Sequence, residues 1–243
     1  MKRMLLTISY DGTAYHGWQV QPNGITVQQT LQEALEKLLA TNVAVTGCSR
    51  TDAGVHARKF ACHIDCENNI PDNAFLKGLN ALLPNDIAVI DCREVSSDFH
   101  ARYNALGKKY IYNMYVGTPN PFDSRYMLHL EKMPDISLMN KFCSGIVGTH
   151  DFSGFSSSKR TVEDTVRTIT ECCVTNDGNY IRFEIQGNGF LYNMVRILTG
   201  TALAVGYGRL DFDCYNDVFK NNDRSKAGET LPAVGLILDE VFY

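Results

Sequence analysis

The sequence predicts an α+β fold built from two ferredoxin-like halves, each with a mainly antiparallel sheet and helices on one face. Two observations predict this fold. The pattern of apolar residues gives the order β-α-β-β-α-β along the first half, and the same order returns along the second half. The join near residues 93–107 is short and charged rather than linker-like, so we place the halves at residues 1–105 and 106–243 of one continuous body. A ligand site is expected at their junction.

The first half is predicted to open with a strand at residues 3–10 and the turn residues Asp11 and Gly12. Thr26 and Gln29 have the spacing of a capping box, which marks the start of a helix. A helical apolar stripe follows the cap and consists of Val27, Leu31, Ala34, Leu35, Leu38 and Leu39. The remaining elements are a strand at 43–48, a loop at 49–57, a strand at 59–66, a helix at 72–83 and a strand at 87–92.

The second half is predicted to begin with a strand at residues 109–116, whose alternate residues share one face. A helix at 136–147 and strands at 166–174 and 180–186 follow, with a turn at Asp177-Gly178-Asn179 between the strands. An apolar stripe then indicates a helix from Leu191 to Val205 that ends near Gly206 and Gly208, and a last strand is expected at 235–242.

The composition is that of an ordinary globular protein, with 44% hydrophobic and 21% charged residues. No apolar run of about 18 residues is present, and the N-terminal segment lacks a cleavage site, so we expect a cytoplasmic protein without a membrane segment. The net charge of -4 disfavours a general nucleic-acid binder but leaves room for a basic cleft. Cys62 and Cys66 fall on one face of a predicted strand, which favours core thiols over metal ligands.

The loop at residues 49–57, with the sequence SRTDAGVHA, concentrates reactive groups next to a strand end. Thr51, Asp52 and Gly54 are also typical of a plain turn, because they favour local backbone bonding and positive φ. Spacing alone leaves the two interpretations even. An Arg, an Asp and a His within seven residues, in a chain with six histidines, favour a functional site.

This loop resembles the signature of the tRNA pseudouridine synthase A family, which reads GRTDAGVHA. Ser49 stands where that family usually has glycine, and Val20 where a basic residue is common. The other segments that resemble the family, in family order, are YDG at 10–12, GWQ at 17–19, DFHARY at 98–103, KKYIY at 108–112, GNGFLYNMVR at 187–196 and AVGL at 233–236. The resemblance extends over nearly the whole chain and implies a pseudouridine synthase fold, in which the two halves are joined through a mainly antiparallel sheet with the active-site cleft between them.

The resemblance implies that the chain isomerises uridine to pseudouridine in the anticodon stem-loop of tRNA, at the positions that the family numbers 38, 39 and 40. It implies Asp52 as the nucleophile, Tyr110 stacking on the target uracil, and Arg196 pairing with Asp52. Arg50 is expected to contact an RNA phosphate or to take the space of the flipped base. The family needs neither cofactor nor metal, and it acts as a homodimer.

Each of these residues also has a purely structural interpretation. Tyr110 lies in a pattern that is typical of a buried core face. Arg196 could be a solvated surface residue, and His56 could be a loop histidine whose hydrogen bonds are made within the protein. A side-chain set of Lys108, Lys109, Arg58 and Arg102 is expected to hold RNA phosphates.

Two rival functions remain at this point. One is an RNA-binding protein without chemistry, and the other is a carboxylate-dependent hydrolase that uses Asp65 or Asp98 as a second acid beside Asp52.

Overall fold

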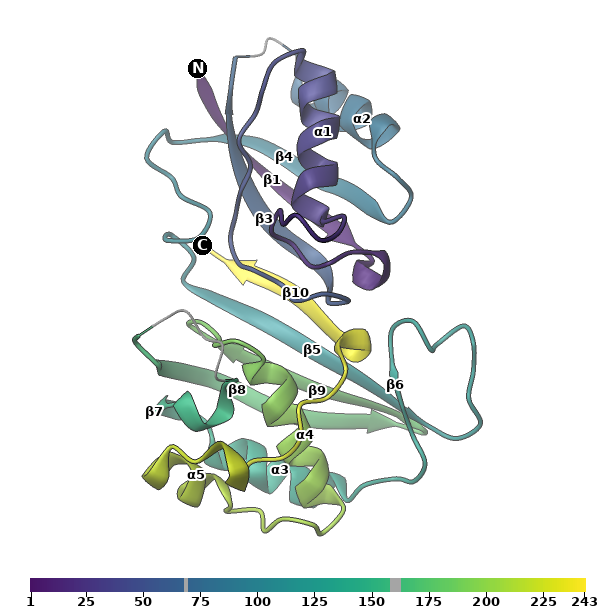
Figure 1. Ribbon diagram of the computed structural model, residues 1–243, viewed down its shortest axis with the longest axis vertical. Coiled ribbons are helices and arrows are strands. Elements are labelled where there is room, and N and C mark those ends of the chain that lie inside the picture. Colours follow the sequence, from purple (N-terminus) through teal and green to yellow (C-terminus); the bar gives the residue numbers. More distant parts are fainter. Residues whose placement is uncertain (68–69, 158–162) are drawn as a thin grey trace. The chain divides into compact units, whose positions relative to one another are not determined.

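The computed structural model describes residues 1–67, 70–157 and 163–243. The chain forms two compact units (Figure 1): unit 1 consists of Met1–Leu106 with Ile237–Tyr243, and unit 2 consists of Gly107–Leu236. Within the described residues no helix is both long enough and apolar enough to cross a membrane.

Unit 1 is a four-stranded ferredoxin-like sheet with an added strand. Its elements are β1 (Lys2–Tyr10), α1 (Val27–Leu39), β2 (Thr46–Gly47), β3 (His56–Cys66), α2 (Asp72–Leu82), β4 (Ile87–Val95) and β10 (Leu236–Phe242). The central strand β1 pairs antiparallel with β4 on one side and with β3 on the other. The far edge of β3 carries β2 in antiparallel orientation and β10 in parallel orientation. The order β4-β1-β3-β2 is that of the ferredoxin-like fold predicted for this half.

Helix α1 begins where its sequence predicts. The Thr26 hydroxyl accepts a hydrogen bond from the Gln29 backbone N–H at 3.3 Å and caps the helix. The Gln29 side chain bonds Glu33 at 2.9 Å, so only one half of the capping box is formed. Helices α1 and α2 pack together where Leu38 lies against Gly78, a position without a side chain.

The alternating face of β3 is a core face, as predicted. Phe60, Cys62, Ile64 and Cys66 are all buried, and all eight cysteines of the chain are free thiols. Two boundaries differ from the prediction. The strand expected at residues 43–48 is only two residues long, and β3 begins at His56 rather than at residue 59. The early start of β3 comes from pairing with Tyr10 and with β10, which no local pattern reveals.

The strands of unit 2 pair antiparallel in the order β5-β9-β8-β7. Helix α3 packs on β8 and on α4. The strand β6 adds to β5 in parallel orientation. Its elements are β5 (Gly107–Val116), β6 (Leu128–Leu130), α3 (Ile136–Gly145), β7 (Gly148–Asp151), β8 (Val166–Asp177), β9 (Tyr180–Gly187), α4 (Met194–Gly206) and α5 (Tyr215–Asn221).

Unit 2 departs from the sequence prediction in its short elements. The strands β6 and β7 and the helix α5 were not expected, because three to seven residues are too few to show a period. Helix α4 begins at Met194 rather than at Leu191, because Asn193 adopts a left-handed conformation with φ of 61° that no helix continues through. Together the strands and helices of the two units make the α+β fold that the sequence predicts.

Candidate active site

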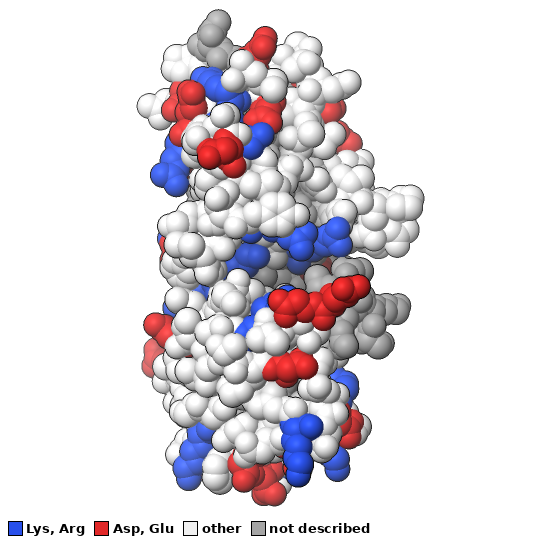
Figure 2. Space-filling view, turned by 90° about the vertical axis from the view of Figure 1, so that its left-hand side faces the viewer, with Lys and Arg blue, Asp and Glu red and all other residues white. Residues whose placement is uncertain are grey.

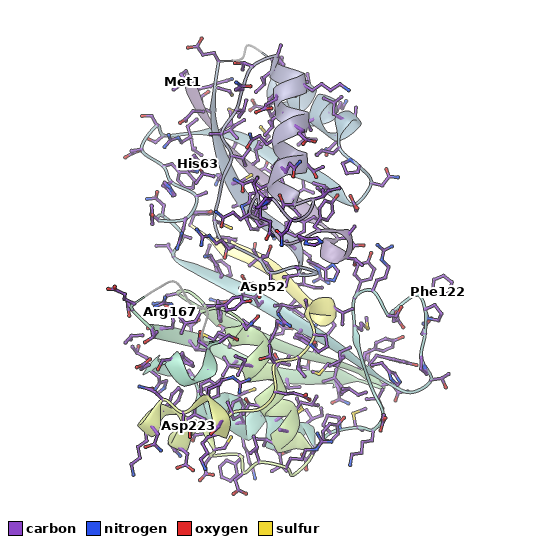
Figure 3. The ribbon with its side chains drawn as sticks, in the orientation of Figure 1. Met1, Asp52, His63, Phe122, Arg167 and Asp223 are labelled. Carbon is purple, nitrogen blue, oxygen red and sulfur yellow. The ribbon has the colours of Figure 1, made fainter. Side chains whose placement is uncertain are left out.

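The loop at residues 49–55 joins β2 to β3 and presents Asp52 on a tight turn (Figure 3). The Val55 N–H donates to the Asp52 carbonyl at 3.1 Å, and Gly54 has a φ of +78°. A positive φ at the third of four residues defines a type II turn, for which glycine is preferred. Thr51 and Val55 are buried on either side, whereas Asp52 is half-buried. The turn therefore anchors its ends in the core and leaves the Asp52 side chain partly accessible.

A second segment of unit 1 holds this loop in place. We call Tyr10–Trp18 the support segment. The Trp18 N–H donates to the Thr51 carbonyl at 3.1 Å, and the Gly54 N–H donates to the carbonyl of Tyr15 at 3.3 Å. The hydroxyls of Tyr10 and Thr51 are 2.9 Å apart in a buried hydrogen bond. Two backbone hydrogen bonds and one between side-chain hydroxyls thus tie Thr51 and Gly54, on either side of Asp52, to the support segment.

Two glycines let the support segment lie against the loop backbone. A Cβ on Gly12 would be 2.0 Å from the Val55 carbonyl oxygen, and a Cβ on Gly17 would be 2.5 Å from the Thr51 carbonyl oxygen. Gly17 also has a φ of +84°, which L residues rarely adopt. Both positions require glycine because a side chain would have no space. Gly17 requires it also because of its backbone conformation.

His56, at the start of β3, is a satisfied structural histidine. Its side chain is 3% exposed, and its Nδ1 lies 3.1 Å from the Gly12 nitrogen and 3.1 Å from the nearer carboxylate oxygen of Asp11. The neutral ring can accept from Gly12, and the ring protonated at Nδ1 can donate to Asp11. In either state His56 ties β3 to the support segment.

The predicted basic side chains of unit 1 differ in their surroundings. Arg50 is exposed beside Asp52, and Arg102 is exposed with its guanidinium 5.8 Å from the Tyr103 ring centre. Arg58 instead lies 3.0 Å from Asp239 of β10 in an ion pair. Arg58 is therefore a weaker candidate for a phosphate contact than the sequence suggests.

Unit 2 contains Tyr110 on β5, opposite Ile185 of β9. Its side chain is 6% exposed, and its ring meets Phe190 edge to face with the centres 5.1 Å apart. Tyr112 and Met114 continue the same buried face, as the structural interpretation of Tyr110 expects. Lys109, on the other face of β5, forms an ion pair with Glu184 at 2.5 Å.

Arg196 lies in the first turn of α4 and is held by its neighbours rather than extended into solvent. Its Nε donates to the Leu231 carbonyl at 2.6 Å, and one terminal nitrogen donates to the Asn193 side chain at 2.8 Å. The left-handed conformation of Asn193 brings its amide back over the helix end. The guanidinium is thereby fixed in one orientation.

Asp52 and Arg50 thus belong to unit 1, and Tyr110 and Arg196 belong to unit 2. The pairing of Asp52 with Arg196, and the place of Tyr110 on the same wall, stay predictions. Figure 2 shows acidic and basic side chains mixed over parts of the visible surface, and it also shows several basic side chains gathered together without an acidic side chain among them. Among the described residues no group of three or more His, Cys, Asp or Glu side chains is arranged to hold a metal ion.

The acids required by a hydrolase differ in availability. Arg3 donates to both carboxylate oxygens of Asp65 at 2.7 and 2.6 Å, and these hydrogen bonds lower the pKa of Asp65. Asp98 is exposed and bonded to Ser96. Asp65 is therefore engaged in a bidentate ion pair, which does not suit a general acid.

Sequence patterns did not single out Tyr15 or Asp86. The Tyr15 hydroxyl donates to the Asp86 carboxylate at 2.6 Å, across 71 positions of the chain. The sequence motifs YDG and GWQ lie at the two ends of the support segment, but they do not indicate which side chain anchors it.

Comparison with known proteins identifies relatives over the full length of the chain. A family model described as tRNA pseudouridine synthase matches residues 6–104 and 143–243. The tRNA pseudouridine synthase A of Clostridium kluyveri is 47% identical over 244 residues, covering 100% of both chains. The tRNA pseudouridine synthase A 2 of Clostridium perfringens is 42% identical, and the tRNA pseudouridine synthase A of Ruminiclostridium cellulolyticum is 45% identical, again over 100% of both chains. Among solved structures, a chain of a Cbf5-Nop10-Gar1 complex is 14% identical with a TM-score of 0.34 and covers 85% of this chain and 55% of its own length.

Proposed function

This chain belongs to the tRNA pseudouridine synthase family and isomerises uridine to pseudouridine in tRNA, and we propose that Asp52 is its nucleophile and the anticodon stem-loop its target. The observation that carries the proposal is the Asp52 turn. The half-buried Asp52 lies between Thr51 and Gly54, which two backbone hydrogen bonds and one side-chain hydrogen bond hold in place, inside the loop that resembles the family signature. Preorganised placement of this kind is what a nucleophile requires.

The reaction needs one bond broken and one bond made at the ribose C1′. The carboxylate of Asp52 attacks the ribose or the uracil ring, and the C1′–N1 bond breaks. The detached base rotates, a C1′–C5 bond forms, and any bond between the substrate and the Asp52 carboxylate breaks, which frees the carboxylate. The C5 proton leaves to solvent while N1 gains a proton, so the product is an isomer of the substrate. A carboxylate can mediate such an exchange through a covalent or closely paired intermediate.

The remaining predicted residues receive roles that suit their surroundings. Residues 1–105 would supply the nucleophile, and residues 106–243 would complete the site. Arg196, fixed by Leu231 and Asn193, would keep the Asp52 carboxylate ionised by pairing with it. Tyr110 would stack on the uracil with its ring supported by Phe190. Both residues are oriented by protein neighbours before any substrate binds.

Arg50 would act on the RNA rather than on the reacting bond. Its exposure two residues before Asp52 suits contact with a phosphate or occupation of the space left by a flipped base. A uridine in a stem must leave the stack to reach a carboxylate, and extrusion costs least near a loop, which favours the anticodon arm. We propose further that the protein acts as a homodimer in the cytoplasm, as its family resemblance implies.

The experiment is tritium release from uridine C5 in a labelled tRNA transcript, without added metal. The wild type should release tritium, and Asp52→Asn should release none, because the amide is not a nucleophile. Asp98→Asn is the matched control: it makes the same exchange at an exposed acid and should keep wild-type release.

Three outcomes would contradict the proposal. Release by Asp52→Asn at the wild-type rate would remove Asp52 from the chemistry. Free uracil among the products would indicate the hydrolase instead. Binding of the tRNA without release from any transcript would indicate the binder without chemistry.

A further inference from the structure

Within the support segment, Tyr15 contacts the Asp52 turn through its backbone and a different part of unit 1 through its side chain. The carbonyl of Tyr15 accepts the Gly54 N–H, so Tyr15 is in direct contact with the turn. The Tyr15 hydroxyl extends to Asp86, in the connection between α2 and β4. The same residue therefore touches the turn at one end and an independent element at the other.

Asp86 anchors the support segment at two points. Its carboxylate accepts the Tyr15 hydroxyl at 2.6 Å, and its backbone carbonyl accepts the Asp11 N–H at 2.9 Å. Tyr15 itself is 6% exposed, so its hydrogen bond to Asp86 is largely shielded from water. A short hydrogen bond to a carboxylate is among the stronger ones in proteins.

The hydroxyl stays a donor at neutral pH. Burial and the hydrogen bond to the Asp86 carboxylate raise the pKa of Tyr15 well above its usual value.

We propose that Tyr15 is a positioning residue of the synthase reaction, whose hydroxyl, anchored on Asp86, fixes the turn that carries Asp52. The inference rests on the proposed role of Asp52 as nucleophile. Tyr15 is not a catalytic residue, because it acts on the turn backbone through Gly54. Loss of the tie leaves the Asp52 side chain intact but lets its backbone shift, and displacements near 1 Å can reduce a rate by about a hundredfold.

The test measures kcat and KM for tRNA by tritium release. Tyr15→Phe removes only the hydroxyl, and it should lower kcat by about ten- to a hundredfold while KM changes by less than about twofold. Asp86→Ala should have the same effect, whereas Asp86→Asn keeps an acceptor oxygen and should restore most of kcat. The double variant Tyr15→Phe/Asp86→Ala should be no slower than either single variant, because both remove one interaction.

Tyr243→Phe is the matched control. Its hydroxyl donates to the Ala101 carbonyl at 2.7 Å in the same unit, away from the support segment. This variant should lose stability without a change in kcat. If Tyr15→Phe has the kcat of wild type, or loses no more than Tyr243→Phe, Tyr15 is merely structural and the inference is overturned. Multiplicative effects of the two single variants would also overturn it.

The design separates this inference from the proposed function. Inactive wild type or active Asp52→Asn would refute the nucleophile and, with it, the inference. Active wild type, inactive Asp52→Asn and unaffected Tyr15→Phe would refute the inference alone. If Tyr15→Phe does not fold, the comparison of Asp86→Ala with Asp86→Asn decides the question.

Discussion

Replacing Gly17 by alanine should destabilise unit 1 and distort the Asp52 turn at once. The substitution adds one methyl group at a position where φ is +84° and the added carbon would be 2.5 Å from the Thr51 carbonyl oxygen. The obstacle is backbone, so no side-chain rotation can relieve it. Thr51 precedes Asp52 directly, so any relief moves Asp52.

Two separate costs make up the expected loss. The left-handed conformation costs an alanine about 1–2 kcal/mol. Overpacking against a fixed neighbour costs a further amount of about 1–3 kcal/mol, and it includes weakening of the hydrogen bond from Trp18 to Thr51. The free energy of unfolding should therefore fall by about 2–5 kcal/mol, the sum of the two ranges.

Gly178→Ala separates the two costs. Gly178 has a φ of +53°, and a Cβ there would meet nothing within 4 Å, so only the conformational cost applies. Urea unfolding followed by circular dichroism measures both variants. For Gly17→Ala the fluorescence of Trp18, the single tryptophan, reports on unit 1 directly, since its ring stacks on Phe60 with the centres 4.1 Å apart. Equal losses in the two variants would refute the close approach of Gly17 to Thr51.

Two further predictions concern stability in unit 1. Burial, with Arg3 and His100 nearby, lowers the pKa of His63 to about 4, so the unfolded chain takes up the proton first. The contribution of His63 to stability should be constant above about pH 6.5 and fall between pH 6.5 and 4. The thermal unfolding temperature of His63→Gln should decline less over this pH range than that of the wild type. An identical decline would exclude His63 as its cause. Thr26→Ala should lower the free energy of unfolding by about 1 kcal/mol through loss of the cap on α1. Thr26→Ser keeps the hydroxyl and should unfold in urea as the wild type does. Equal losses in the two variants would show that the cap contributes nothing.

The elements predicted best are those whose signal is local. Helix α1 carries its own apolar stripe and its own cap at Thr26, so its start is confirmed to the residue. The face of β3 through Cys62 and Cys66 is read correctly for the same reason, because alternation within one strand decides it. The positive φ expected at Gly54 is also confirmed, and it too depends on a local signal.

The features that sequence reasoning missed are set by distant residues. The true start of β3 depends on β10, which is about 180 residues further along, and the tie from Tyr15 to Asp86 spans 71 positions. The sequence suggested Arg58 as a phosphate ligand because its ion-pair partner Asp239 is equally far away along the chain. Local patterns thus located the Asp52 loop but could not reveal what supports it.

The strand β10 has a consequence for how the enzyme is made. It pairs with β3 at His56 and Ala57, directly after the Asp52 turn, yet the ribosome adds it only after all of unit 2. Domains generally fold in the order of their synthesis, but unit 1 has to wait with one edge of β3 open. A nascent chain interrupted anywhere in unit 2 would hold every residue of the Asp52 loop and still lack the strand beside it. Incomplete chains therefore contain the Asp52 loop without the strand that pairs with the residues directly after it.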